Sequence, residues 1–288
     1  MRSDRGEDAL ARTHALLMER YDAMPVLERV ILRQEWTVVL GSDPRCNSMA
    51  INFTGKHAVT EYEPLESHTA MCSDMLGMPL CDVAKRCLPA LSPFLRSLGV
   101  AALGAMSQPF LNKESLTGGG YRFVPSFRAL IRPDDVVAVV GYGELVDGMR
   151  GSCAQLHVTE MRPPDHFYAI SVGSEGTARI PPDVHVHPAE ENREVLGSAD
   201  VVLITASTLV NRTFDEVLRY ASSARLVGMY GPTGSLLPDA FMEAGIDAMR
   251  LFEIDDSATF RKDAHAPGAL ERRLKQAQRS HCIVRERP

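Results

Sequence analysis

Residues 199–213 place a strand directly before a group of small polar side chains. Residues 201–204 are four consecutive apolar residues, mostly β-branched, and a run without alternation is typical of a parallel strand covered on both faces. The next four residues, 205–208, are small and mostly hydroxyl-bearing. In open α/β sheets, ligands bind outside the carboxyl ends of the strands. We therefore expect a ligand-binding edge here. Alternatively, Ser207 and Thr208 cap a helix expected at about residues 213–221.

The second part of the chain, from residue 132, alternates strands and helices. Buried strands are expected at residues 136–143, 156–160, 199–205, 225–230 and 248–254. Strands that alternate with helices form parallel βαβ units. The fold class that we predict is α/β, with a Rossmann-like parallel sheet in a domain spanning residues 132–288.

The first part, residues 1–131, has a different order of elements. A helix is expected at residues 8–22, and strands at residues 26–32, 36–40, 46–53 and 58–62, followed by helices at residues 80–87 and 93–106. Strands first and helices afterwards indicate a smaller α+β domain. The small residues around Ala101 to Ala105 suit close packing, either in a core or in the interface of a homo-oligomer.

Glycines and an acidic residue define a second expected part of the binding edge. Gly141 and Gly143 follow the first strand of the predicted sheet, where the backbone has to turn and approach a ligand closely. Glu160 ends the next strand, nineteen positions after Gly141, where a carboxylate can accept hydrogen bonds from ribose hydroxyls. Glu160 could equally be an exposed charge at the strand end.

The glycine pattern argues against a dinucleotide. A full Gly-x-Gly-x-x-Gly motif needs a third glycine at position 146, where this chain has Val146. The close approach to a pyrophosphate is therefore not supported. A ligand with one nucleoside and no pyrophosphate, such as S-adenosylmethionine, fits better than NAD.

Charge and hydropathy exclude other partners. The 288 residues carry a net charge of −6, whereas nucleic-acid binding needs clustered Lys and Arg. No apolar run approaches the ~20 residues of a membrane span, and the amino-terminal residues do not resemble a signal peptide. We expect a cytoplasmic protein that binds a small-molecule ligand, without nucleic-acid or membrane partners.

Two groups of residues could hold a transition metal ion. Cys72, Cys81 and Cys87 lie in one region of the sequence, and thiolates are ligands for copper(I) or zinc. Alternatively, these cysteines are core residues, the commoner role of buried free cysteine. His185 and His187 are two positions apart, which places both imidazoles on one side of an extended segment. A surface loop is the alternative for this pair.

Several of these segments also resemble a known family. The motifs are Val139-Val-Gly-Tyr142, residues 199–213 and Gly231-Pro-Thr-Gly-Ser-Leu-Leu-Pro238. In this order they resemble the uncharacterised family called the putative heavy-metal chelation domain. Glu35-Trp-Thr-Val-Val39 and residues 97–103 are similar to the companion domain that precedes it, whose fold is similar to the N-terminal domain of enolase. The resemblance covers roughly residues 12–262.

The resemblance implies an enolase-N-like domain packed on a Rossmann-like domain, with a ligand cleft between them and a suspected link to metal chelation. Thr205, Ser207, Thr208 and Asn211 match the family's hydroxyl-rich turn, and residues 231–233 match its second turn. The chain departs from the family pattern at Gly104, where asparagine is usual, and at residues 143–144.

The first functional hypothesis is an enzyme of small-molecule metabolism that uses S-adenosylmethionine for a transfer, cyclisation or lyase reaction. Tyr142, Asp147 and Glu35 are the acid/base candidates. The predicted cofactor-binding residues gather at the ends of strands: Gly141, Tyr142, Gly143, Glu160, Met161, Thr205, Ala206, Ser207, Thr208, Asn211, Gly231, Pro232 and Thr233. The alternative hypothesis is a non-catalytic protein that binds a heavy metal or a metallophore through the cysteines or the histidine pair. A scaffold without chemistry is a third hypothesis.

Overall fold

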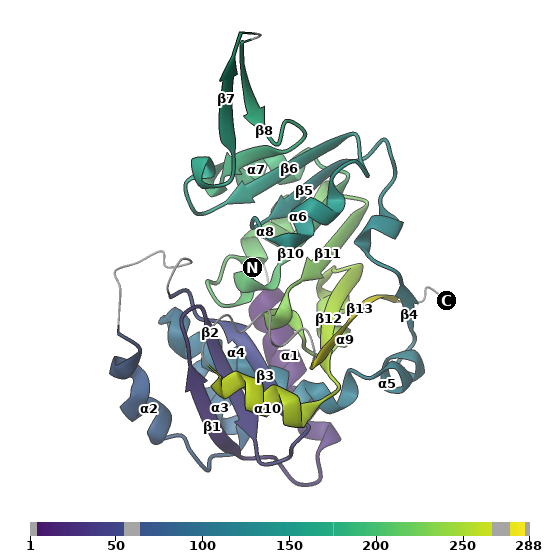
Figure 1. The fold of residues 1–288 in the computed structure, drawn as a ribbon. Coiled ribbons are helices and arrows are strands. Elements are labelled where there is room, and N and C mark those ends of the chain that lie inside the picture. Colours follow the sequence, from purple (N-terminus) through teal and green to yellow (C-terminus); the bar gives the residue numbers. More distant parts are fainter. Residues whose placement is uncertain (1–4, 55–63, 175, 267–276, 286–288) are drawn as a thin grey trace.

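The structure is a computed structural model that describes residues 5–54, 64–174, 176–266 and 277–285. These residues form a large upper sheet and a small lower sheet, with helices on both (Figure 1). The predicted strand at residues 58–62 lies outside the described residues.

The large sheet has eight strands in the order β4-β13-β12-β11-β10-β5-β6-β9. The six strands from β12 to β9 are parallel to one another, and β13 is antiparallel to both of its neighbours, β12 and β4. The strands are β4 (Tyr121–Val124), β5 (Val136–Val140), β6 (Gln155–Glu160), β9 (His185–Pro188), β10 (Val201–Thr205), β11 (Leu226–Tyr230), β12 (Ala248–Ile254) and β13 (Gln278–Arg285). The prediction of an α/β fold with a mostly parallel sheet is confirmed.

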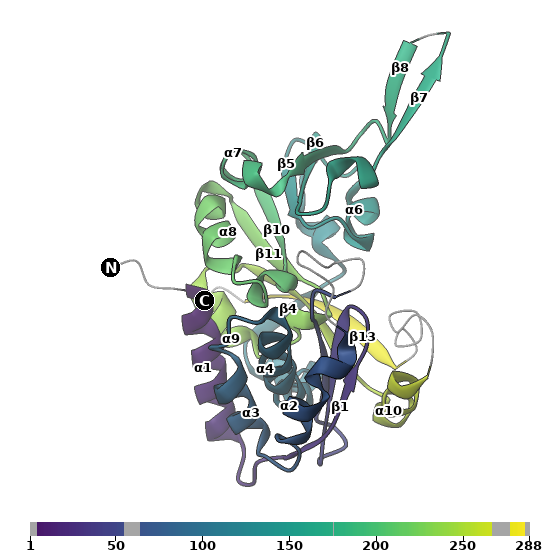
Figure 2. The same cartoon turned by 90° about the vertical axis from the view of Figure 1, so that its left-hand side faces the viewer.

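Helices cover both faces of this sheet. In Figure 2, α7 and α8 lie on one side of the parallel strands and α6 lies on the other. The helices of this part are α6 (Glu144–Met149), α7 (Asn192–Gly197), α8 (Phe214–Tyr220), α9 (Pro238–Ala244) and α10 (Ser257–His265). Because β5 and β10 are covered on both faces, their Val, Ile, Leu and Ala side chains are buried almost throughout.

The smaller sheet is an antiparallel meander of β1 (Leu27–Leu32), β2 (Trp36–Gly41) and β3 (Asn47–Ile51). The helices of this part are α1 (Arg5–Arg20), α2 (Thr69–Ser73), α3 (Leu80–Cys87), α4 (Pro93–Ser107) and α5 (Lys113–Gly118). Ser92 begins α4 by accepting a hydrogen bond from the Leu95 N–H. The likeness of this part to enolase stays a prediction.

Helix α4 is packed on several sides and belongs to the core. A Cβ added at Gly99 would lie 2.9 Å from the Leu88 nitrogen, and one added at Gly104 would lie 2.4 Å from the Ser48 hydroxyl. Small residues therefore let α4 approach both the end of α3 and strand β3 closely. Because residues 96–107 are all buried within one chain, this helix is a core element and not an exposed face for a second copy.

The two parts of the chain share one hydrophobic core. Helix α1 packs against α9, and the main cluster of buried apolar residues includes side chains from both sheets. Strand β4, which precedes residue 132, pairs with β13 in the large sheet. The division between residues 131 and 132 stays a prediction.

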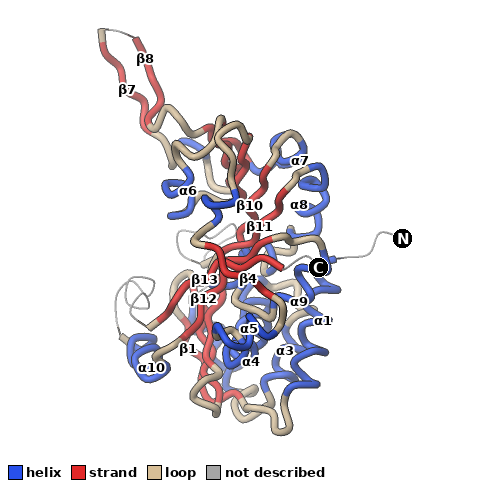
Figure 3. Tube along the Cα trace, turned by 90° about the vertical axis from the view of Figure 1, so that its right-hand side faces the viewer, coloured by secondary structure: helices blue, strands red, loops and turns tan. Residues whose placement is uncertain are grey.

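Strands β7 (Ala169–Gly173) and β8 (Gly176–Ile180) form a separate antiparallel hairpin. The hairpin projects from the end of the molecule next to β6 (Figures 2 and 3). All of its strand residues are exposed. Among the residues that the structure describes, none of the helices has the length and apolar character required to span a bilayer.

Candidate functional site

The order of the large sheet reverses between β5 and β10. The chain passes from β5 outward to β6 and β9, then returns to the other side of β5 as β10. Such a reversal is the switch point at which open α/β sheets bind ligands. Gly141 directly follows β5 and has a φ of 89°, and a Cβ added there would lie 3.1 Å from Thr205 Cγ2 at the end of β10. Two residues of the predicted site therefore meet at the switch point.

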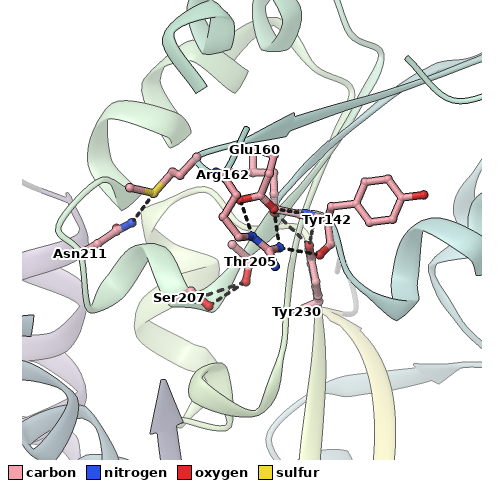
Figure 4. Close-up of polar contacts among 10 residues, drawn as sticks. Tyr142, Glu160, Arg162, Thr205, Ser207, Asn211 and Tyr230 are labelled. Carbon is pink, nitrogen blue, oxygen red and sulfur yellow. Dashed lines mark hydrogen bonds and ion pairs between the residues drawn. The ribbon is translucent and has the colours of Figure 1, made fainter. Parts of the chain in front are cut away.

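Tyr230, at the end of β11, contacts the backbone at the end of β5. Its hydroxyl lies 2.9 Å from the carbonyl oxygen of Val140 and 2.8 Å from that of Gly141 (Figure 4). Burial, together with the negative charge of Glu160, raises the pKa of Tyr230. The neutral phenol therefore acts as a hydrogen-bond donor that fixes the end of β5 relative to β11.

The hydroxyl-rich turn forms a short 3-10 helix, η7 (Ala206–Leu209), after β10. Thr205 Oγ1 donates to Ser207 Oγ at 3.1 Å, and both side chains are partly accessible. Thr208 is buried and donates to the Thr205 carbonyl at 2.7 Å. Ser207 and Thr208 do not cap α8, whose N-cap residue is Thr213. Thr205 and Ser207 are therefore the hydroxyls of this turn that a ligand could reach.

Asn211 and Met161 meet beside this turn. Asn211 Nδ2 lies 3.3 Å from the Met161 sulfur (Figure 4), and Asn211 Oδ1 accepts a hydrogen bond from the Thr213 hydroxyl at 2.7 Å. The Met161 side chain is 48% exposed. Met161 therefore adds an accessible apolar surface to an otherwise polar edge.

The second predicted turn contacts the smaller sheet. Gly231 adopts a φ of 104° and begins a 3-10 helix, η9 (Pro232–Gly234). The buried Thr233 Oγ1 accepts a hydrogen bond from the Ile51 N–H at 3.0 Å. Pro232 is partly accessible, and Ala206 packs tightly behind this turn, since a Cβ added at Gly234 would lie 2.7 Å from the Ala206 Cβ. The end of β3 therefore joins the carboxyl edge of the large sheet.

Glu160 is held by its own neighbours. Arg162 donates to Glu160 Oε1 through its backbone N–H at 3.0 Å and to Oε2 through Nη2 at 2.8 Å, and the Tyr142 N–H donates to Oε2 at 2.9 Å. Burial alone would raise the pKa of Glu160, but these hydrogen bonds outweigh it and lower the pKa. Glu160 therefore fixes the turn after β5 as an ionised carboxylate.

The three predicted catalytic residues lie on different elements. The Tyr142 ring stacks on Phe167 at 4.9 Å and points away from Thr205 and Ser207 (Figure 4). Burial, followed by the charge of Asp147, raises the pKa of Tyr142, so the phenol is neutral near pH 7. Asp147 is exposed on α6. Glu35 lies in the turn between β1 and β2 with a φ of 73°.

Glu35 nonetheless lies at the junction with the large sheet. Its carbonyl accepts a hydrogen bond from the Asn52 N–H at 2.9 Å, and its own N–H donates to Thr54 Oγ1 at 2.9 Å. Asn52 follows Ile51, which contacts the η9 turn. The structure therefore brings Glu35 near the Thr233 turn.

Buried Arg96 of α4 holds the hydroxyl-rich turn, η7, through a hydrogen bond to its backbone. Its side chain is 2% exposed, and Nε donates to the Leu209 carbonyl, the last residue of η7, at 2.6 Å. A second nitrogen donates to the Leu88 carbonyl at the end of α3. A charge from the first part of the chain thus fixes the turn that carries Thr205 and Ser207.

The cysteine group is part of the core. Cys72, Cys81 and Cys87 are buried free thiols, and burial raises the pKa of Cys72 and of Cys87 to about 11. Metal ligation requires the thiolate, which this environment disfavours. Packing is therefore the role that the structure supports for these three residues.

Three histidines lie close together on β6 and β9, the last two strands on one side of the large sheet. His185 and His187 lie on β9 and not in a surface loop, and β9 pairs with β6 so that His157 stands opposite His185. His157 Nδ1 lies 3.0 Å from His187 Nε2, and His187 Nδ1 lies 2.8 Å from Glu191 Oε2. Burial, together with His185 and His187, lowers the pKa of His157. Across the described part of the chain, no three His, Cys, Asp or Glu side chains are already arranged as a metal site.

Sequence reasoning missed several of these residues. Arg162 stands two positions after Glu160, and this spacing of opposite charges at a strand end was a usable signal. His157, Tyr230 and Arg96 carried no local signal because their partners are 30, 90 and 113 positions away.

Comparison with known proteins gives the chain a family. The model of the family DUF364, described as "Putative heavy-metal chelation", matches residues 126–281. This chain belongs to that family. An uncharacterised protein of Methanocaldococcus jannaschii is 28% identical over 172 residues, which are 59% of this chain and 60% of that protein. The chain thus matches less than two thirds of the length of this curated relative.

Solved structures of the same family share the fold. A DUF364 protein of unknown function from Desulfitobacterium hafniense is similar with a TM-score of 0.67 and 18% identity, over 96% of this chain and 98% of that one. Another, from Pyrococcus horikoshii, is similar with a TM-score of 0.71 and 19% identity, over 96% and 99% of the two chains. At this identity the likeness supports the fold alone.

Proposed function

We propose that this DUF364 protein binds a small organic ligand at the carboxyl edge of β5, β10 and β11. The observation that carries this proposal is the meeting of Gly141 and Thr205 at the reversal of strand order. Backbone without a side chain lies there beside the partly accessible hydroxyls of Thr205 and Ser207. Oxygen donors and backbone groups suit hydrogen bonding to an organic molecule better than ligation of a soft metal ion.

S-Adenosylmethionine is the ligand that we propose to test first, and its transfer, cyclisation or lyase reactions define the activity class. Glu160 is already bound by Arg162 and by the Tyr142 N–H. The ribose hydroxyls would therefore be bound by Thr205 and Ser207 and not by Glu160. The accessible Met161 and the Asn211 amide beside it would contact the adenine or the amino-acid part.

Isothermal titration calorimetry of the intact protein with S-adenosylmethionine and S-adenosylhomocysteine tests this proposal. We expect Ser207→Ala to weaken binding about tenfold, which corresponds to the loss of one hydrogen bond of about 1.4 kcal/mol. Ser171→Ala, on the exposed hairpin, is the matched control and should leave the affinity unchanged.

Two outcomes separate the parts of this proposal. Absence of binding of both adenosine compounds would reject the adenosine ligand. Native mass spectrometry of the purified protein would then test the edge itself, because any co-purified organic ligand should be lost in a Gly141→Val variant. Retention of such a ligand by Gly141→Val would place the binding site elsewhere.

Activity assays of Tyr142→Phe, Asp147→Asn and Glu35→Gln address catalysis, which stays a prediction.

Binding of a transition metal is the second candidate function. The family description favours it, and the gathering of three imidazoles on β6 and β9 is the structural observation in its support. Metal analysis of purified protein by mass spectrometry tests it, and a metal content near zero after growth with added zinc or nickel would count against it.

A further inference from the structure

Four side chains share one face of the large sheet at its β9 edge. In the β6–β9 register, His157 is paired with His185, and Thr159 is paired with His187. Side chains two positions apart on a strand, and those of paired residues, project from the same face. The three imidazoles therefore form a cluster: the His157 ring centroid lies 5.0 Å from that of His185 and 5.2 Å from that of His187.

The rings of His157 and His187 already direct two nitrogens at each other. His157 Nδ1 and His187 Nε2 are 3.0 Å apart, so a single proton lies between them. Two histidine nitrogens on one tetrahedral zinc ion, each about 2.0 Å from the metal, are separated by about 3.3 Å. A metal ion that replaces the shared proton therefore requires only a small separation of the rings.

The other nitrogen of each ring is held by a neighbouring side chain. Glu191 Oε2 lies 2.8 Å from His187 Nδ1, and Gln155 Oε1 lies 3.1 Å from His157 Nε2. A carboxylate on the far nitrogen of a histidine is the usual support of a metal ligand, because it fixes the ring orientation and raises its basicity. Glu191 is in position to do this for His187.

Unsatisfied polar atoms occur in the same part of the fold. The Thr159 hydroxyl is buried and has no hydrogen-bond partner among the described residues, although Thr159 is paired with His187. Asn192 Oδ1, in the residue after Glu191, is also buried without such a partner. Buried polar atoms are normally satisfied by protein or by water, so this face is suited to an ordered water or a hydrated ion.

We propose that His157 and His187 bind a divalent transition metal ion at the β6–β9 edge, with His185 as a third ligand. His185 is exposed on the edge strand, so its ring can turn toward the ion without movement of the backbone. Glu191 is a positioning residue for His187. Imidazole donors select zinc, nickel or copper over magnesium or calcium. This inference rests on the second candidate function and is independent of the ligand at the carboxyl edge.

Titration of the EDTA-treated, dialysed full chain with zinc chloride in a calorimeter tests the site. We expect one zinc ion per chain in the wild type. His157→Ala and His187→Ala should each raise the Kd at least tenfold, and Glu191→Gln should raise it several-fold, less than either histidine variant. His265→Ala on α10, outside this cluster, is the matched control and should leave the Kd unchanged.

The outcomes distinguish the site from the function. Zinc binding by the wild type with an unchanged Kd in both histidine variants would overturn this site and leave metal binding by the protein intact. No zinc binding by the wild type would overturn both. His187→Gln, which keeps a polar side chain next to Glu191, replaces the alanine variant if circular dichroism shows that His187→Ala is unfolded. Cobalt(II) absorption gives an independent readout, because ligation by His157 and His187 should produce d–d bands that both variants lose.

Discussion

The large sheet has two polar edges that are held in different ways. At the carboxyl edge, most contacts end on backbone atoms: Tyr230 on the Val140 and Gly141 carbonyls, and Arg96 on the Leu209 carbonyl. At the β6–β9 edge, His187 contacts His157 on one side and Glu191 on the other through side chains alone. Contacts that end on backbone atoms fix the turns of the carboxyl edge, whereas side chains at the β6–β9 edge can change their rotamers without movement of a strand.

The location of the two edges in the fold explains the difference. The carboxyl edge lies where the two parts of the chain meet, and the Ile51 N–H of β3 contacts Thr233 there. The histidine edge ends the sheet, and its strand β9 has a sheet partner on one side, β6. The carboxyl edge is therefore packed between the two parts of the chain, which fixes the positions of its side chains. The side chains of the outer strand β9 stay more accessible to solvent.

The largest effect is expected from removing the buried charge beneath the carboxyl edge. Arg96→Met removes the buried hydrogen bonds from Arg96 to the Leu209 and Leu88 carbonyls. Of these two carbonyls, only that of Leu88 keeps a donor among the described residues, Arg212. The variant should lower the free energy of unfolding by about 3 kcal/mol. Urea denaturation measures it. Arg29→Met, an exposed arginine on β1, should change stability by about 0.5 kcal/mol or less. Equal effects of the two variants would show that Arg96 does not support the turn.

Two glycines that are two positions apart, Gly141 and Gly143, test how rigid the backbone of the same edge is. Gly141→Ala places a Cβ at a positive φ and 3.1 Å from Thr205 Cγ2, and should cost about 1–3 kcal/mol. Gly143 has an extended φ of −150° and nothing within 4 Å of an added Cβ. Gly143→Ala should therefore cost about 0.5 kcal/mol or less, and a larger loss for Gly143→Ala than for Gly141→Ala would contradict the backbone argument.

The pH dependence of stability examines the Glu160 anchor. Because its folded-state pKa is lowered, its contribution is present above the ordinary carboxyl pKa of about 4 and is lost as the pH falls through the lower value. Glu160→Gln should be about 1–3 kcal/mol less stable than the wild type at pH 7, and the difference should shrink at pH 3. Urea midpoints at both pH values measure it, and a difference that grows in acid would refute the assignment.

The smallest effect is expected at the histidine edge. Thr159→Val removes a buried hydroxyl that has no partner among the described residues, and an apolar replacement of the same shape should leave stability unchanged or raise it by about 1 kcal/mol or less. Thermal denaturation measures the change. A clear loss of stability would mean that the hydroxyl has a bound partner, such as an ordered water.

Local patterns predicted the parallel strands well. Runs such as residues 136–140 and 201–204 are apolar without alternation, and this pattern depends on burial of both faces and not on distant partners. Thr205 and Ser207 were placed correctly at the end of a strand for the same reason, since they follow directly on a recognisable strand. Their role in binding stays a prediction.

The roles of individual polar residues were harder to predict. Glu160 looked available for a ribose because its sequence position was considered without Arg162. His185 and His187 looked like a surface pair because β9 is short and is recognised only by its pairing with β6. Strands β13 and β4 were missed because an antiparallel pair at the border of a parallel sheet has no distinct local pattern.

The sequence by itself determined the α/β class, the parallel strands and the hydroxyl-rich edge after β10. These depend on the periodicity of apolar residues and on small polar residues at strand ends, which are local properties. Only the tertiary structure decided that Gly141 meets Thr205, that Thr233 contacts Ile51, and that His157 joins His187. Those contacts depend on the strand order and on the β6–β9 register, which arise from packing between segments 30 to 182 residues apart.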